Sequence, residues 1–253
     1  MQALVDILRD QAWHGFIVFL RVAAIASLLP AFGEETVPAR IKLILALAFT
    51  LIVAPAVPQT TQAPGMPALT LLVLTEALTG LALGIGIRLF ILALQTAGAI
   101  AAQSTSLSQI LGGAVRDPLA AIGYVLIIGA LALAVMAGLH VKVAELVILS
   151  YDIMPIGVFA DASDLSDWGL DQIRRAFALA FTLAAPFILV SVLYNLALGA
   201  INKAMPQLMV AFVGAPVITA GGLIILCVSG PLILTVWLDA LDTFLAAPFR
   251  TVP

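Results

Sequence analysis

Few residues in this sequence could support catalysis or metal binding. There are two histidines, His14 and His140, and one cysteine, Cys227, which lies inside an apolar run. A metal site needs several converging ligands, and the chain has no H-E-x-x-H pattern, nucleophile elbow, Walker lysine loop or dinucleotide fingerprint. We therefore expect no enzyme activity, no metal and no cofactor. We expect His140 to be a packing or interfacial residue and Cys227 to be a buried small hydrophobe.

Four charged residues lie inside apolar segments, and their charge limits the surroundings that they can have. They are Arg21, Glu76, Arg88 and Asp152. Each would cost roughly 2.5–3.5 kcal/mol at a lipid-exposed helix centre, so we expect all four to face protein or water. Twelve residues separate Glu76 from Arg88, and that is about 120° around a helix. Their partners must therefore lie elsewhere in the fold or on another subunit.

Two other charged groups have a simpler interpretation. Lys142 and Glu145 have the i,i+3 spacing of a local ion pair on a helix. The stretch DASDLSDWGLDQIRR, which begins at Asp161, lacks the acidic residues at alternate positions that a calcium loop has. We expect it to form a solvated loop in which Asp167 caps a helix that begins near Trp168.

The composition is that of an integral membrane protein in contact with membrane lipid. Of the 253 residues, 63% are hydrophobic and 10% are charged, against roughly 25% charged in soluble domains. The mean hydropathy is +1.18. A formal net charge of -3 provides no basic footprint, so we expect no nucleic-acid partner.

The apolar segments predict an all-α membrane protein of kinked helices and helical hairpins. A helix needs about 20 apolar residues to cross a bilayer, so five to seven passes fit the chain. No internal repeat or long hydrophilic insert is present, which favours a single domain over residues 1–253. Residues 2–11 could form a short amphipathic helix ahead of the first span. The segments are 12–33, 41–58, 67–94, 119–139, 143–160, 176–202 and 204–238.

The last two segments predict a long helical hairpin. Residues 204–238 are all uncharged and would extend roughly 52 Å as one helix, beyond a hydrocarbon core of about 30 Å. Because prolines and paired glycines interrupt this run, we expect a broken or strongly curved helix. Farther upstream, Gly80 and Gly84 share a helix face that a second backbone could approach closely.

Several short motifs occur in a characteristic order along nearly the whole chain. Residues 21–55 carry an Arg, then a Pro and a Gly, then Val-Pro-x-Arg-x-Lys before an apolar helix. The later motifs are EALTGLALGIGIRL at 76–89, Asp117-Pro118, the Gly138 and His140 region, SYDIMPIG at 150–157 and MPQLMVAFVGAPV at 205–217. Together they resemble the FliR family of flagellar biosynthesis proteins.

This resemblance implies a core subunit of the flagellar type III protein export gate, in the bacterial inner membrane at the flagellar basal body. Its partners would be FliP, FliQ, FlhB and FlhA, and its cargo unfolded flagellar proteins that pass through a conduit. Residues 1–160 would form a FliP-like part and 161–253 a FliQ-like hairpin, built to pack in a helical assembly. The family-motif residues expected at subunit packing positions are Arg21, Pro30, Gly33, Pro38, Arg40, Glu76, Gly80, Gly84, Arg88, His140 and Pro216.

Two alternatives remain open. The related export-gate subunit of virulence injectisomes shares this fold and mechanism. A secondary transporter would also use helices broken by Pro and Gly, but the sequence has no corresponding halves and no carboxylate cluster within its apolar segments.

The polar stretch QSTSLSQILGGAVRDP, residues 103–118, matches the family's loop that projects into the conduit; we name it the gate loop. Its polar side chains suit a wetted lumen, its glycines permit rearrangement, and its apolar residues could form a constriction. The alternative is an ordinary connector between two spans. The first part of this loop often has Gly and Phe in the family, and in this chain these positions are Thr105, Ser106 and Leu107. The residues assigned to this loop are Gln103, Ser104, Ser106, Leu107, Gln109, Ile110, Leu111, Gly112, Gly113, Asp117 and Pro118.

We expect deletion of the gate loop to raise ion leakage through the assembled gate, because the loop would no longer close the conduit. Single-channel conductance of the reconstituted assembly measures this. Unchanged conductance in the deletion variant would contradict the gate assignment and favour the connector.

Overall fold

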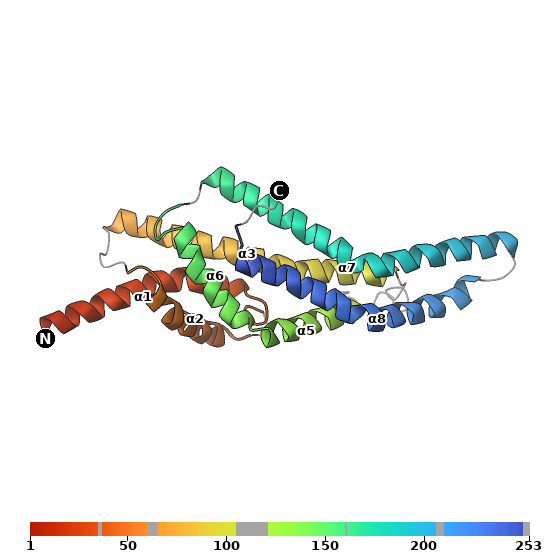
Figure 1. Cartoon of the computed structure of the whole chain (residues 1–253), viewed down its shortest axis with the longest axis horizontal. Helices are drawn as coiled ribbons and strands as arrows, with labels where there is room; N and C mark the ends of the chain where they lie inside the picture. The colour runs from red at the N-terminus through yellow and green to blue at the C-terminus, as the bar shows by residue number, and fades with distance from the viewer. Residues whose placement is uncertain (35–36, 60–64, 105–120, 160, 206–209, 250–253) are drawn as a thin grey trace. The chain divides into compact units, whose positions relative to one another are not determined.

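The computed structural model describes residues 1–34, 37–59, 65–104, 121–159, 161–205 and 210–249, and these contain helices but no strand (Figure 1). The all-α prediction is therefore confirmed. The helices are α1 (Gln2–Leu28), α2 (Ala39–Val53), the short 3-10 helix η1 (Ala54–Ala56), α3 (Met66–Ser104), α5 (Ala121–Met136), α6 (Leu139–Ile153), α7 (Ala162–Ala204) and α8 (Val210–Ala246).

The number of spans agrees with the sequence. Within the described ranges, five helices are long and apolar enough to cross a membrane, and α5 with α6 makes a sixth if the two form one broken span. The break falls at Gly138, whose φ of 81° is a left-handed conformation that favours glycine. The proposed separate helix at residues 2–11 does not exist as such, because α1 runs without interruption from Gln2.

Of the two forms expected for the last apolar segment, a break does not occur within α8, which is continuous from Val210 to Ala246 although it contains Pro216 and Pro231. The strongly curved form stays a prediction. The prediction for the acidic stretch is wrong. The acidic stretch is not a loop, because α7 already begins at Ala162. Its cap is Asp161, not Asp167: the Asp161 Oδ1 accepts hydrogen bonds from the Ser163 N–H at 2.9 Å and the Ser163 hydroxyl at 2.6 Å.

The chain divides into two compact units that alternate along the sequence. Unit 1 comprises Met1–Leu89, Val135–Ile173 and Leu241–Pro253, and unit 2 comprises Phe90–Ala134 and Arg174–Ala240. The proposed parts 1–160 and 161–253 are defined by resemblance rather than by compactness, and they stay a prediction. In unit 1, α2 packs beside α1 and α6.

Unit 2 contains the predicted hairpin, in which α7 runs back along α8 in the antiparallel direction (Figure 1). Trp237 is fully buried, and its indole N–H donates to the Phe90 carbonyl at 2.8 Å. A Cβ on Gly98 of α3 would overlap the backbone of Gly123 on α5. The absence of side chains at these two positions thus lets two helix backbones meet.

Large apolar side chains remain exposed along the helices, as in a protein whose surroundings are lipid or other protein. Leu51 is 77% exposed on α2, Leu193 is 67% exposed on α7 and Val228 is 77% exposed on α8. Cys227, which neighbours Val228, is exposed as well. The prediction of a buried cysteine is wrong, because an apolar run in a membrane protein does not indicate which face is covered.

The contact between α3 and α5 leads to a prediction. We expect Gly98→Ala to lower the stability of the protein by about 1–3 kcal/mol, the usual cost of overpacking, because the new methyl group has no space. Gly199→Ala is the matched control: a Cβ at Gly199 has no neighbouring atom within 4 Å, and alanine favours a helix. Thermal unfolding in mild detergent measures both. Equal unfolding temperatures for the two variants would contradict the proposed close contact.

Candidate functional site

The predicted site residues lie in three places. Gln103 and Ser104 form the C-terminal end of α3, where Gln103 is exposed and Ser104 is half-buried. The rest of the gate-loop residues, Ser106, Leu107, Gln109, Ile110, Leu111, Gly112, Gly113, Asp117 and Pro118, lie outside the described residues. Most of the family-motif residues lie in unit 1, and several of them meet there.

The centre of unit 1 is an ion pair between Arg21 on α1 and Glu76 on α3. The Arg21 Nε donates to the Glu76 Oε2 at 2.9 Å, and the Arg21 Nη2 donates to the Glu76 Oε1 at 3.1 Å. This is the bidentate arrangement in which a guanidinium best matches a carboxylate. The Arg21 and Glu76 side chains are 1% and 0% exposed.

The helix α6 and the turn that follows it supply the other partners of this pair. The Arg21 Nη1 donates to the Ser150 hydroxyl at 3.0 Å, and the Arg21 Nη2 donates to the Met154 carbonyl at 2.9 Å. The guanidinium carbon lies 3.7 Å from the centre of the Tyr151 ring, which is a cation–π contact. The Gly157 N–H donates to the Glu76 Oε1 at 3.1 Å. The network therefore joins α1, α3, α6 and one turn.

Such a network can stabilise but has no visible means of catalysis. Two buried charges offset their desolvation only when geometry is good and the remaining polar groups are hydrogen-bonded, and both conditions are met here. Neither group faces a described cleft, and the described residues contain no group of three His, Cys, Asp or Glu side chains that could hold a metal ion. We interpret the network as the structural centre of unit 1.

A second ion pair explains the charge at Arg88. The Arg88 Nη1 donates to the Glu34 Oε1 at 2.6 Å, and both side chains are partly exposed. Glu34 follows a tight turn in which the Gly33 N–H donates to the Leu29 carbonyl at 2.6 Å. A Cβ on Gly33 would lie 2.5 Å from the Ser27 carbonyl oxygen, so this turn requires glycine. The Lys42 ammonium donates to the Gly33 carbonyl at 2.9 Å.

The glycines of α3 allow α1 to approach its backbone. A Cβ on Gly80 would lie 2.5 Å from the Arg21 carbonyl oxygen, and a Cβ on Gly84 would lie 3.1 Å from the Leu28 Cβ. Bulkier residues at these positions would push α1 away from α3. The motif glycines thus hold the two helices at the separation that the Arg21–Glu76 hydrogen bonds need.

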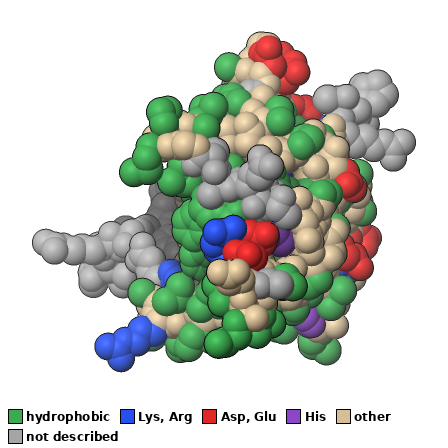
Figure 2. Space-filling view, turned by 90° about the vertical axis from the view of Figure 1, so that its left-hand side faces the viewer, with side chains coloured by type: hydrophobic (Ala, Val, Ile, Leu, Met, Phe, Trp, Pro, Cys, Tyr) green, Lys and Arg blue, Asp and Glu red, His purple; other side chains and the backbone are tan. Residues whose placement is uncertain are grey.

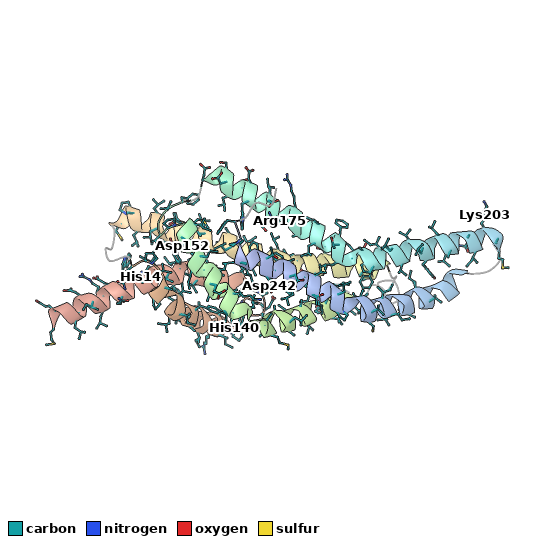
Figure 3. The ribbon with its side chains drawn as sticks, in the orientation of Figure 1. His14, His140, Asp152, Arg175, Lys203 and Asp242 are labelled. Carbon is teal, nitrogen blue, oxygen red and sulfur yellow. The ribbon has the colours of Figure 1, made fainter. Side chains whose placement is uncertain are left out.

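The other family-motif residues do not join this network. Pro30 is buried, whereas Pro38, at the N-terminal cap of α2, and Arg40, in its first turn, are exposed. Pro216 lies in α8, and its side chain is not described. Figure 3 shows His140 on α6 and His14 on α1. His140 is exposed. His14 is buried, and its Nε2 donates a hydrogen bond to the Ala54 carbonyl at 2.8 Å.

Lys142 does not form the predicted ion pair with Glu145. Its ammonium instead donates to the Asp242 Oδ1 at 2.7 Å, and it thereby joins α6 to α8 within unit 1. The partners that sequence reasoning missed are Glu34, Ser150, Tyr151 and Asp242. For Glu34 a signal was available, since it is an acid beside an apolar segment in a chain with unpaired basic residues. Ser150 and Tyr151 lie in the motif SYDIMPIG, but no local pattern paired them with Arg21, or Asp242 with Lys142, because these partners are distant along the chain.

Comparison with known proteins places the chain among bacterial export proteins. The family model described as "Bacterial export proteins, family 1" matches residues 12–244. The flagellar biosynthetic protein FliR of Caulobacter vibrioides is 34% identical over 90% of this chain and 93% of its own length. The FliR proteins of Escherichia coli and Bacillus subtilis are 29% and 26% identical, over 86% and 84% of this chain and 84% of their own lengths. The resemblance inferred from the motifs is confirmed.

The ion pair leads to a second prediction. We expect Arg21→Met to destabilise the protein by about 3–5 kcal/mol, because Glu76 would remain buried and uncompensated. Arg21→Met combined with Glu76→Leu should lose less than the sum of the single variants, and a double-mutant cycle of thermal unfolding in detergent measures the coupling.

Arg9→Met is the matched control, since Arg9 is 74% exposed and its ion pairs with Asp6 and Asp10 are long, at 3.8 Å and 3.7 Å. It should change stability by less than about 1 kcal/mol. Additive losses from the two single variants would show that the Arg21–Glu76 pair is not a coupled unit.

Proposed function

We propose a function from the premise that this chain belongs to bacterial export proteins, family 1. Three relatives from different bacteria carry the name flagellar biosynthetic protein FliR. The similarity to each of them extends over more than four-fifths of both chains. We infer that this protein is likewise a membrane component of flagellar biosynthesis that acts in protein export. This similarity along the whole chain is the observation that carries the proposal.

The finer proposal is that the protein is a subunit of the flagellar type III export gate. It would assemble with FliP and FliQ around a conduit for unfolded flagellar proteins, beside FlhB and FlhA, in the bacterial inner membrane at the basal body. The gate loop, residues 103–118, would close this conduit, and its polar composition supports a position in a wetted lumen.

The side-chain contacts of unit 1 support a role as a packed subunit. Its two deepest charges, Arg21 and Glu76, satisfy each other within the chain, so neither needs a charged group from another protein. The surfaces left for partners are apolar helix faces, such as that around Leu51 in unit 1 and that around Leu193 in unit 2. Helices in a membrane associate through close packing more than through hydrophobicity, and these faces could pack against other subunits.

In this proposal the protein works by shape and position. It would line and close a path for other proteins, and it would need no bound cofactor. The family description names export and no reaction. The injectisome alternative shares the same mechanism, but the flagellar name of all the relatives reported above favours the flagellar branch.

A genetic experiment tests the proposal. Deletion of the gene in its flagellated host should abolish swimming and the secretion of hook and filament subunits, because the export path would lack a subunit. Expression of the parent chain should restore both activities, and so should the Arg9→Met variant. Normal secretion of flagellar subunits by the deletion strain would contradict the proposal.

Native mass spectrometry distinguishes the gate from a transporter. After co-expression with the neighbouring export-gate genes and purification in mild detergent, the tagged chain should be found in a large hetero-oligomer. A lone monomer or homodimer under the same conditions would count against the gate and would make solute uptake the next measurement.

A further inference from the structure

A cleft of about 650 Å³ lies within unit 1, where α6 ends and α7 begins. Its volume is within the range of sites that hold small molecules. Most of its lining is apolar or aromatic, and three carboxylates stand among these residues. We call it the acidic cleft. The residues that line it are Ile153, Met154, Val158, Phe159, Asp161, Asp164, Leu165, Asp167, Trp168 and Phe249.

Two walls of the acidic cleft are held in place by hydrogen bonds. The Trp168 indole N–H donates to the Pro248 carbonyl at 2.7 Å, and the Trp168 and Phe249 rings lie 5.9 Å apart. On the other side, the Met154 carbonyl accepts from the buried Arg21. The cleft is therefore largely preformed, which lowers the entropic cost of binding.

The apolar part of the cleft is partly open to its surroundings. Val158 is 54% exposed and Phe159 is 49% exposed, while Trp168 and Phe249 are half-buried. These side chains belong to a turn and to helix ends, next to exposed carboxylates, and not to the middle of an apolar span. An exposed aromatic and aliphatic group of this kind is typical of a binding surface.

The carboxylates give the cleft a negative rim. Asp161, Asp164 and Asp167 follow each other at intervals of three residues, so they share one face at the start of α7. All three are exposed, and among the described residues no Lys, Arg or His forms a salt bridge with any of them. Figure 2 shows acidic side chains at the top of its face, the level at which α7 begins in Figure 1.

Hydrogen bonds favour the charged form of one rim carboxylate, that of Asp161. The hydrogen bonds from the Ser163 hydroxyl and the Ser163 N–H hold the pKa of Asp161 below its usual value. The three negative charges of the rim also exceed the positive charge at the start of α7, because the helix dipole contributes only about half a positive charge there. A cation is thus the complementary partner for the rim, and a phosphate or carboxylate would be repelled.

We propose that the acidic cleft is a docking site for an amphipathic segment of a partner protein, with an Arg or Lys at the aspartate rim and an apolar side chain in the cleft. A bare metal ion fits less well, because much of the lining is carbon and the Asp161 Oδ1 already accepts two hydrogen bonds from Ser163. An aromatic wall beside carboxylates suits a guanidinium, which can stack and form hydrogen bonds at once. This inference goes beyond the proposed function and does not depend on it.

A binding experiment with the full chain tests the proposal. The protein is reconstituted in phosphatidylcholine nanodiscs, and the probe is a short fluorescent peptide that alternates Arg with Leu and Phe. Its counterpart has Glu in place of every Arg, and empty nanodiscs measure the contribution of lipid. We expect saturable binding of the Arg peptide, seen as a rise in anisotropy that weakens with added salt.

Substitutions in the rim and in the apolar part of the cleft distinguish binding at the cleft from binding elsewhere on the protein surface. Asp164→Asn with Asp167→Asn should weaken binding at least tenfold, and Phe159→Ser should weaken it independently of charge. Asp6→Asn with Glu145→Gln is the matched control: it removes two exposed carboxylates of unit 1 that do not line the cleft. This control should bind as the parent does. Thermal unfolding establishes that each variant is folded.

Three results would overturn the proposal. The first is equal binding of the Arg peptide and the Glu peptide to the protein. The second is equal affinity of the parent and the folded rim variant for the Arg peptide. The third is an anisotropy rise with empty nanodiscs equal to that with the protein, which would assign the binding to lipid. If the rim variant does not fold, an unchanged affinity of Phe159→Ser overturns the docking site. Secretion does not enter this assay, so its failure and the failure of the export proposal are distinguishable.

Discussion

The buried pair of Arg21 and Glu76 is the interaction on which unit 1 depends. Neither charge could remain alone among apolar helices, because an uncompensated buried ion is far more costly than a paired one. Their hydrogen bonds determine how α1, α3 and α6 meet, and they also position the turn from Met154 to Gly157. That turn leads to one wall of the acidic cleft, so the ion pair and the cleft are parts of one structure.

The close packing of helices complements this electrostatic constraint. Gly80 and Gly84 let α1 approach α3 at the level of the ion pair, and in unit 2 Gly98 and Gly123 do the same for α3 and α5. In a membrane there is little hydrophobic force between apolar helices, so surfaces that fit closely must supply the attraction. Polar satisfaction inside and small residues at contacts together explain how so apolar a chain acquires a defined fold.

The wrong predictions for Cys227 and Lys142 share one cause, because a local sequence pattern does not indicate which surroundings or which helix a side chain faces. Cys227 was expected to be buried because it lies in an apolar run, yet in a membrane protein an apolar residue can face lipid or protein equally well. Prolines and paired glycines were expected to break or strongly curve the last long helix, and α8 is not broken at Pro216 or Pro231. Lys142 was paired with a residue on its own helix although Asp242, from α8, is its partner.

The sequence by itself determined the class of protein, a range of five to seven spans and the family. These follow from composition, from the lengths of apolar segments and from ordered motifs, all of which are local or additive properties of the chain. It also indicated that Arg21, Glu76 and Arg88 need partners, because a charge in an apolar segment is costly wherever it lies. Only the tertiary structure decided which partners they have and where the acidic cleft is formed. Those contacts join residues far apart in the chain, and no local pattern encodes which helices become neighbours.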